Sequence, residues 1–205
     1  MGDENKQEDL FMSIPWLTFV STAILVLKEW KVIKKFFGFK SFTLGKEQSA
    51  EIQRLIEGLG ERYQLNRVTL SRFKKPKNPP VTLEDYKALK LSITHEFVYN
   101  SESIKDKFQN AGCENFADAM MLLDASIEGY IVIPPGPNAK MDNMIQVQNL
   151  YDVVKSYRFK IGPNVIDGSL ALSFTHESYE QELDAESLQH IKNIARRIYL
   201  IINKK

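Results

Sequence analysis

The sequence has few of the residues that build disulfide frameworks and metal centres. Its 205 residues include one cysteine, Cys113, so no intramolecular disulfide can form and a Cys-rich zinc site is excluded. The three histidines, His95, His176 and His190, are far apart and form no His-x-x-x-His pair. We therefore expect no bound metal.

Motifs typical of nucleotide enzymes and serine hydrolases are also missing. The chain contains no Gly-x-Gly-x-x-Gly, no P-loop and no Gly-x-Ser-x-Gly. Cys113 lies in a Gly-Cys-Glu turn with no histidine adjacent in sequence to act as a base. The 27 basic and 26 acidic residues nearly balance, so no global field favours nucleic acid. We expect no enzyme activity, no catalytic residues, no cofactor and no nucleic-acid partner.

One uncharged run near the N-terminus predicts a transmembrane helix. Residues 10–27, LFMSIPWLTFVSTAILVL, carry no charge, and a helix continued to Trp30 would be about 31 Å long. We expect Trp16, Lys28 and Trp30 to help anchor it, with Trp30 at headgroup level and Lys28 snorkelling. A buried core helix or a cleaved signal peptide would also fit, although the acidic tail at 1–9 does not resemble a signal peptide.

The segment after the predicted span, residues 31–46, is basic. From residue 28 to residue 40 the chain has five lysines, among them Lys31, Lys34 and Lys35, against one glutamate. Basic residues beside a span are retained on the cytoplasmic side. We expect a single-pass protein of the inner membrane with its soluble domain in the cytoplasm.

Residues 47–205 predict one α+β domain of about 160 residues, a common size for a single core. Residues 50–63 have the apolar spacing of a helix, and 66–73 reads as a strand. Arg72, Lys74, Lys75 and Lys77 then form a basic cluster that could bind an anion or an acidic partner, or could be a solvated loop. Residues 89–99 alternate apolar and polar residues, as in a strand with one buried face.

The second half of the domain predicts further helices and a hairpin. Residues 101–111 and 115–127 read as helices, YIVI at 130–133 as a strand, and the residues around Met144 and Val147 as another helix. SYRFKIG and GSLALSFTH read as a hairpin, and 185–203 as a long final helix. Hairpins imply an antiparallel sheet with helices on its faces.

The pattern resembles a GAF-like, PAS-related domain. The resemblance is carried by RVTLSRF at 67–73, LSITHEFV at 91–98, IKDKFQNA at 104–111, and the stretch from the final hairpin to the closing helix. It implies a small-ligand cavity, which we expect between the sheet and residues 101–127, with His95 and Tyr130 as polar wall groups. The chain lacks the Cys-His pair of chromophore-attaching GAF domains and the Asn-Lys…Asp-Glu signature of cyclic-nucleotide GAF domains, so neither bilin nor cyclic GMP is expected.

The final helix has more apolar positions than one packing stripe needs. Ile194, Ile198, Ile201 and Ile202 widen its face, which predicts either a homo-oligomer interface or a helix buried wholly in its own domain. In GAF-like proteins the first and last helices commonly build the dimer interface.

Two functions follow from the sequence as hypotheses. The first is a membrane-anchored GAF-like binding or regulatory module that self-associates and recognises a protein partner or small ligand, as in small phage or bacterial membrane proteins. The alternative is a phage lysis protein, since the layout also resembles the T-even phage holin, in which one N-terminal span precedes a globular domain that would control timing.

Overall fold

The computed structural model describes residues 44–136, 141–175 and 182–204. They belong to one compact unit that spans Leu44–Lys205. The predicted tail and span, with Trp16, Lys28 and Trp30, lie outside the described residues, and so do Lys31, Lys34 and Lys35 of the basic flank. Within the described residues no helix combines the length and the apolar character needed to cross a membrane.

An antiparallel sheet forms the centre of the domain, as predicted, and it has six strands. The strand order is β3-β2-β1-β6-β5-β4, and every neighbouring pair is antiparallel. The strands are β1 (Arg67–Phe73), β2 (Lys90–Val98), β3 (Ala111–Gly112), β4 (Tyr130–Ile133), β5 (Lys155–Lys160) and β6 (Ser169–Phe174). The predicted hairpin is β5 and β6.

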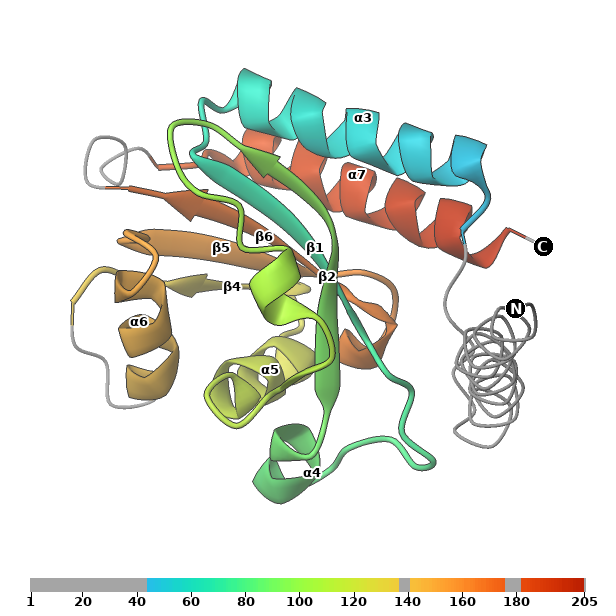
Figure 1. Cartoon of the computed structure of the whole chain (residues 1–205), viewed down its shortest axis with the longest axis vertical. Helices are drawn as coiled ribbons and strands as arrows, with labels where there is room; N and C mark the ends of the chain where they lie inside the picture. The colour runs from blue at the N-terminus through green and yellow to red at the C-terminus, as the bar shows by residue number, and fades with distance from the viewer. Residues whose placement is uncertain (1–43, 137–140, 176–181, 205) are drawn as a thin grey trace, which may run out of the picture. The chain divides into compact units, whose positions relative to one another are not determined.

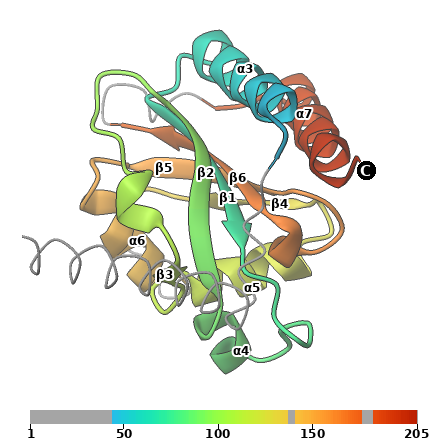
Figure 2. The same cartoon turned by 45° about the vertical axis from the view of Figure 1, so that its right-hand side comes forward.

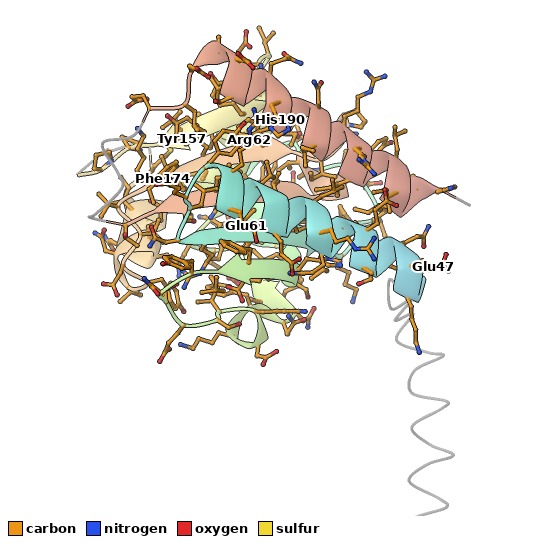
Figure 3. All side chains as sticks on the ribbon, turned by 90° about the horizontal axis from the view of Figure 1, so that it is seen from above. Glu47, Glu61, Arg62, Tyr157, Phe174 and His190 are labelled. Atoms are coloured by element: carbon orange, nitrogen blue, oxygen red, sulfur yellow. The ribbon has the colours of Figure 1, made fainter. Side chains whose placement is uncertain are left out.

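Two long helices cover one face of this sheet. α3 (Lys46–Arg62) and α7 (Ala185–Asn203) lie side by side on it (Figure 1). Ile52 and Ile56 of α3 and Ile191 and Ile198 of α7 are fully buried against apolar strand residues. In the view from above, α3 and α7 are again neighbours, with Tyr157 and Phe174 labelled on the strands (Figure 3). α7 begins where the carboxylate of its N-cap, Asp184, accepts a hydrogen bond from the backbone N–H of Ser187.

Shorter elements cover the other face. They are α4 (Leu83–Lys87), the 3-10 turn η1 (Asp106–Phe108), α5 (Ala117–Ala125) and α6 (Asp142–Asn149), which lie across the sheet from α3 and α7 (Figure 2). Met120 and Leu123 of α5 and Met144 of α6 pack in a second apolar core with Leu91. Because both faces are covered, every residue of β1 and of β6 is buried.

One predicted helix is absent. Residues 101–111 contain only the turn η1 and the start of β3, instead of a helix. The carboxylate of Glu96 accepts hydrogen bonds from the backbone N–H groups of Ile104, at 3.1 Å, and Lys105, at 3.2 Å. These donors are therefore satisfied by a side chain, and the segment runs as a loop across the sheet.

Candidate functional site

A partly open cavity lies between the sheet and the elements opposite α3 and α7. Its volume is about 60 Å³. The floor is formed by side chains of β1, β5 and β6: Arg67, Thr69, Ser71, Arg158, Ala171 and Ser173. The remaining wall is largely apolar and comes from β2, the 101–116 segment, α6 and the turn after it: Leu91, Ile93, Ile104, Phe108, Phe116, Met144, Val147, Gln148, Tyr151 and Val153.

The polar floor follows from strand alternation. Along β1, Val68 and Leu70 point to α3 and α7, so Thr69 and Ser71 point to the cavity. Register places Ala171 of β6 between Thr69 and Arg158 in one row across the sheet. The small alanine leaves space beside the guanidinium, in a layer where its neighbours are polar.

Arg158 has no counter-charge in the part of the chain that the structure describes. No hydrogen bond or ion pair to its guanidinium is seen there, and its Nε atom is buried without a partner. Burial lowers the pKa of Arg158 to about 10. Among the described residues, the titratable group that acts on its pKa is the Cys113 thiol. Burial raises the pKa of that thiol to about 12, so the thiol is uncharged near neutral pH. The guanidinium of Arg158 is therefore a positive charge without a counter-ion among the described residues.

Gln148 is a second polar group with unused capacity in the cavity wall. The residue is 5% exposed, its Nε2 contacts the Ser156 hydroxyl, and its Oε1 is buried without a hydrogen-bond partner. An amide can exchange its oxygen and nitrogen by rotating about its last side-chain bond. Gln148 can therefore offer the cavity either an acceptor or a donor while the other end stays on Ser156.

Arg67 also lines the cavity and its Nε is likewise buried without a hydrogen bond, but its charge, in contrast to that of Arg158, is paired within the protein. Its Nε lies 3.3 Å from Oε1 of Glu96, and both side chains are 4% exposed. Its Nη2 donates to the Ser101 hydroxyl at 3.1 Å and to the carbonyl of Glu102 at 2.6 Å. Burial lowers the pKa of Arg67, opposed by the charge of Glu96. The Arg67–Glu96 pair thus fastens residues 101–105 beside the cavity.

Aromatic rings close the wall beyond this fastening. The ring of Phe108 makes edge contacts with Phe116 and Tyr151, each at a centroid distance of 5.7 Å. The ammonium of Lys107 lies 5.6 Å from the ring centre of Tyr151. The turn η1 is therefore held to α5 and to the end of α6 by ring contacts.

The two residues predicted as pocket walls, His95 and Tyr130, lie on the opposite face of the sheet. His95 is 5% exposed, and its Nε2 is 2.9 Å from the Ser49 hydroxyl of α3. Tyr130 stacks on Phe159 with ring centroids 5.3 Å apart, and Lys192 of α7 lies over its ring. Neither lines the cavity, so their predicted placement is wrong.

A β-bulge explains the position of His95. Leu70 pairs with His95 while Ser71 pairs with Ile93, so Thr94 is an extra residue in β2. The extra residue reverses the alternation, and Ile93 faces the cavity while His95 and Phe97 face α3. The position of Tyr130 follows from the alternation of side chains along β4. Tyr130 and Val132 pack with the core beneath α3 and α7, whereas Ile131 and Ile133 pack with the core on the cavity side.

The predicted basic cluster is divided by burial. Arg72 is 8% exposed and belongs to β1, and burial lowers its pKa, opposed by Asp167. Lys74, Lys75 and Lys77 are exposed, and the ammonium of Lys75 is 3.8 Å from the carboxylate of Asp167. Arg72 therefore does not share a surface patch with the three lysines, and an anion-binding role for the lysines stays a prediction.

The residues predicted for self-association are mostly used within the domain. Ile198 and Ile201 are 0% and 7% exposed, and Ile194 and Ile202 are partly buried against the same core. Because α7 packs on α3 as well as on the sheet, it needs a wider apolar face than one stripe. Ile198 and Ile201 are thus not available for an interface, which corrects the prediction for them.

Neither a metal site nor a reactive thiol emerges from the described ranges. No group of three or more His, Cys, Asp or Glu side chains with metal-binding geometry occurs among them. Cys113 is fully buried, and its raised pKa opposes formation of the nucleophilic thiolate.

Comparison with known proteins identifies the fold. No family model matches the chain, and no curated protein matches its sequence. A far-red cyanobacteriochrome photoreceptor is similar with 16% identity and a TM-score of 0.56, over 88% of this chain and 98% of that one. The blue-light absorbing form of the PixJ GAF domain of Thermosynechococcus elongatus is similar with 11% identity and a TM-score of 0.53, over 78% of this chain and 86% of that one. A GAF domain/HD domain protein of Geobacter sulfurreducens is similar with 8% identity and a TM-score of 0.53, over 76% of this chain and 91% of that one. The chain therefore has a GAF-like fold.

Sequence reasoning missed Arg158 and Gln148. The alternation in SYRFKIG, with Tyr157 and Phe159 on one face, does put Arg158 on the other. What the alternation could not indicate is which face of the sheet contains a cavity, because that depends on the elements that cover it.

Proposed function

We propose that this domain is a sensory or regulatory module that binds a small molecule in the cavity between the sheet and α6. The observation that carries the proposal is a pair of buried polar atoms in residues that line this cavity, Nε of the half-buried Arg158 and Oε1 of the buried Gln148, neither of which has a hydrogen-bond partner. Buried polar groups without partners are costly in a fold, so a site that keeps them favours a ligand as the missing partner.

The similar solved structures add support at the level of fold. One of them is a photoreceptor by name and another is the blue-light absorbing form of a GAF domain, and the chain shares their GAF-like architecture at low identity. Their chemistry does not transfer, because a cavity of about 60 Å³ is smaller than the cavity of about 150 Å³ that accommodates benzene in an engineered protein. The proposal is therefore a site for a molecule of only a few non-hydrogen atoms.

A thermal-shift screen of the full chain against a chemically varied set of small molecules tests the proposal. A ligand that binds only the folded state raises the unfolding temperature in proportion to the logarithm of its concentration. At least one compound should do so, and the shift should be lost on filling the cavity with Ala171→Leu. If no compound stabilises the wild type, or if the larger residue leaves every shift unchanged, the cavity is not a binding site.

We propose also that residues 10–30 anchor this module in the inner membrane with the domain in the cytoplasm. The support is the uncharged run and the lysines that follow it. A C-terminal green-fluorescent fusion should be bright and a C-terminal alkaline phosphatase fusion inactive; the reverse result would overturn the orientation. Permeabilised inner membranes on induction, lost on deletion of residues 10–27, would favour the holin alternative instead.

A further inference from the structure

We infer that the cavity takes a short carboxylate, with its charged group on the guanidinium of Arg158 and its hydrocarbon end against the apolar wall. The inference rests on the proposed function and names the class of its ligand. Its first support is charge: Arg158 lines the cavity without a counter-ion within the described part of the chain. Arginine donates through a planar fork that matches the two oxygens of a carboxylate.

The second support is the separation of polar and apolar lining. Hydroxyls of Thr69, Ser71 and Ser173 surround the sheet side, each residue less than a tenth exposed. Across the cavity stand side chains such as Ile104 and Met144. A ligand that satisfies both sides has one polar end and one apolar end, which a short carboxylate has and an inorganic oxyanion lacks.

The third support is what the lining lacks. Among the described residues that line the cavity there is no aspartate or glutamate. An α-amino acid would bring an ammonium group that needs an acidic partner or several acceptors when it is desolvated. The lining offers only neutral acceptors, which are Oε1 of Gln148 and the hydroxyls of Thr69, Ser71 and Ser173. The lining therefore favours a carboxylate without an amino group.

Size sets the length of the molecule and the affinity to expect. A volume of about 60 Å³ suits acetate or propionate better than a longer chain. The best small ligands bind with about 1.5 kcal/mol per non-hydrogen atom, so the five such atoms of propionate limit its Kd to about 3 μM at the tightest. The titrations must therefore reach millimolar concentrations.

The experiment is calorimetric titration of the full chain, in a non-ionic detergent, with four probes. Propionate is compared with propionamide, which has the same shape without the charge, with alanine, which adds the ammonium, and with nitrate, which lacks the hydrocarbon. Each probe is titrated into the wild type, Arg158→Gln, Arg158→Lys and the control Arg196→Gln. Arg196 is exposed on α7, so the control removes the same charge from the other side of the sheet.

We expect propionate to bind the wild type at least tenfold more tightly than the other three probes. Arg158→Gln should weaken propionate by about 10- to 100-fold, the effect of one hydrogen-bonded charge, and leave propionamide unchanged. Arg158→Lys should recover part of the affinity, and Arg196→Gln should bind as the wild type does. Removing an uncompensated charge is not expected to destabilise the fold.

Several outcomes would overturn the inference. Equal binding of propionate and propionamide to the wild type would show that the carboxylate charge is not recognised. This comparison needs no variant. Tighter nitrate or alanine binding replaces the proposed class by another. An unchanged affinity of Arg158→Gln for propionate would show that Arg158 does not bind the carboxylate. If none of the four probes binds, the inference fails, while a hit in the thermal-shift screen that Ala171→Leu abolishes would show that the proposed function stands without it.

Discussion

Replacing Glu96 with glutamine should weaken the domain by leaving a buried arginine without its counter-ion. The Glu96 and Arg67 side chains are each 4% exposed and 3.3 Å apart, and removing one partner of such a pair costs about 3–5 kcal/mol. The glutamine oxygen can still accept from the backbone N–H of Ile104, so we expect the lower limit, about 3 kcal/mol. For a domain of this size that corresponds to a drop in Tm of roughly 6–12 °C.

The assay is thermal unfolding followed by far-ultraviolet circular dichroism, with Glu102→Gln as the matched control. Glu102 pairs with Lys107 at the surface, where its side chain is 86% exposed, so this control should change stability by less than about 1 kcal/mol. The double variant Arg67→Met with Glu96→Gln should recover part of the loss, because no lone charge remains buried. A double variant as unstable as the sum of both single variants would refute the reasoning.

Three further predictions concern packing and pH. Gly60→Ala should cost about 1–3 kcal/mol in urea unfolding, because a Cβ there would lie 2.2 Å from the ring of Phe97; unchanged stability would show that this contact can relax. Burial lowers the pKa of His95, with a contribution from Lys105; below pH 6.5 the unfolded chain therefore binds a proton that the folded chain does not, and stability falls. His95→Gln should lessen that fall between pH 7.5 and 5.5, and an identical pH profile would exclude His95 as the cause. Ile201→Glu should unfold the protein, whereas Leu200→Glu, at a position 59% exposed, should not; sedimentation in which Ile201→Glu stays folded and only dissociates would instead place Ile201 in an interface.

The elements with strong periodicity could be read from the sequence. The strand at 67–73, the final hairpin and the helix at 185–203 are all present in the structure. Each has a pattern that one local physical rule explains: alternation for a strand with two unlike faces, glycines at a hairpin bend, and apolar spacing of three and four for a helix. α4 could also have been predicted, because Thr82 and Asp85 form a capping box that is visible as T-x-x-D.

The candidate site was harder to predict because it depends on long-range contacts. The loop at 101–105 is fixed by Arg67, more than thirty residues earlier in the chain, and helical propensity does not include that contact. The bulge at Thr94 moves His95 to the other face by one residue of register, which no pattern around it indicates. The cavity itself exists only because α6 and the 101–116 segment cover polar side chains of the sheet.

The most direct test of ligand binding in the cavity uses methionine methyl resonances of the full chain. Met144 lines the cavity and is 2% exposed, whereas Met121 is 36% exposed on α5 and does not line it. On titration with propionate, the Met144 methyl signal should shift and saturate, the Met121 signal should stay in place, and Arg158→Gln should move the midpoint to higher concentration. A Met144 signal that stays in place while a bound ligand stabilises the protein would contradict the account, because the ligand would then bind elsewhere.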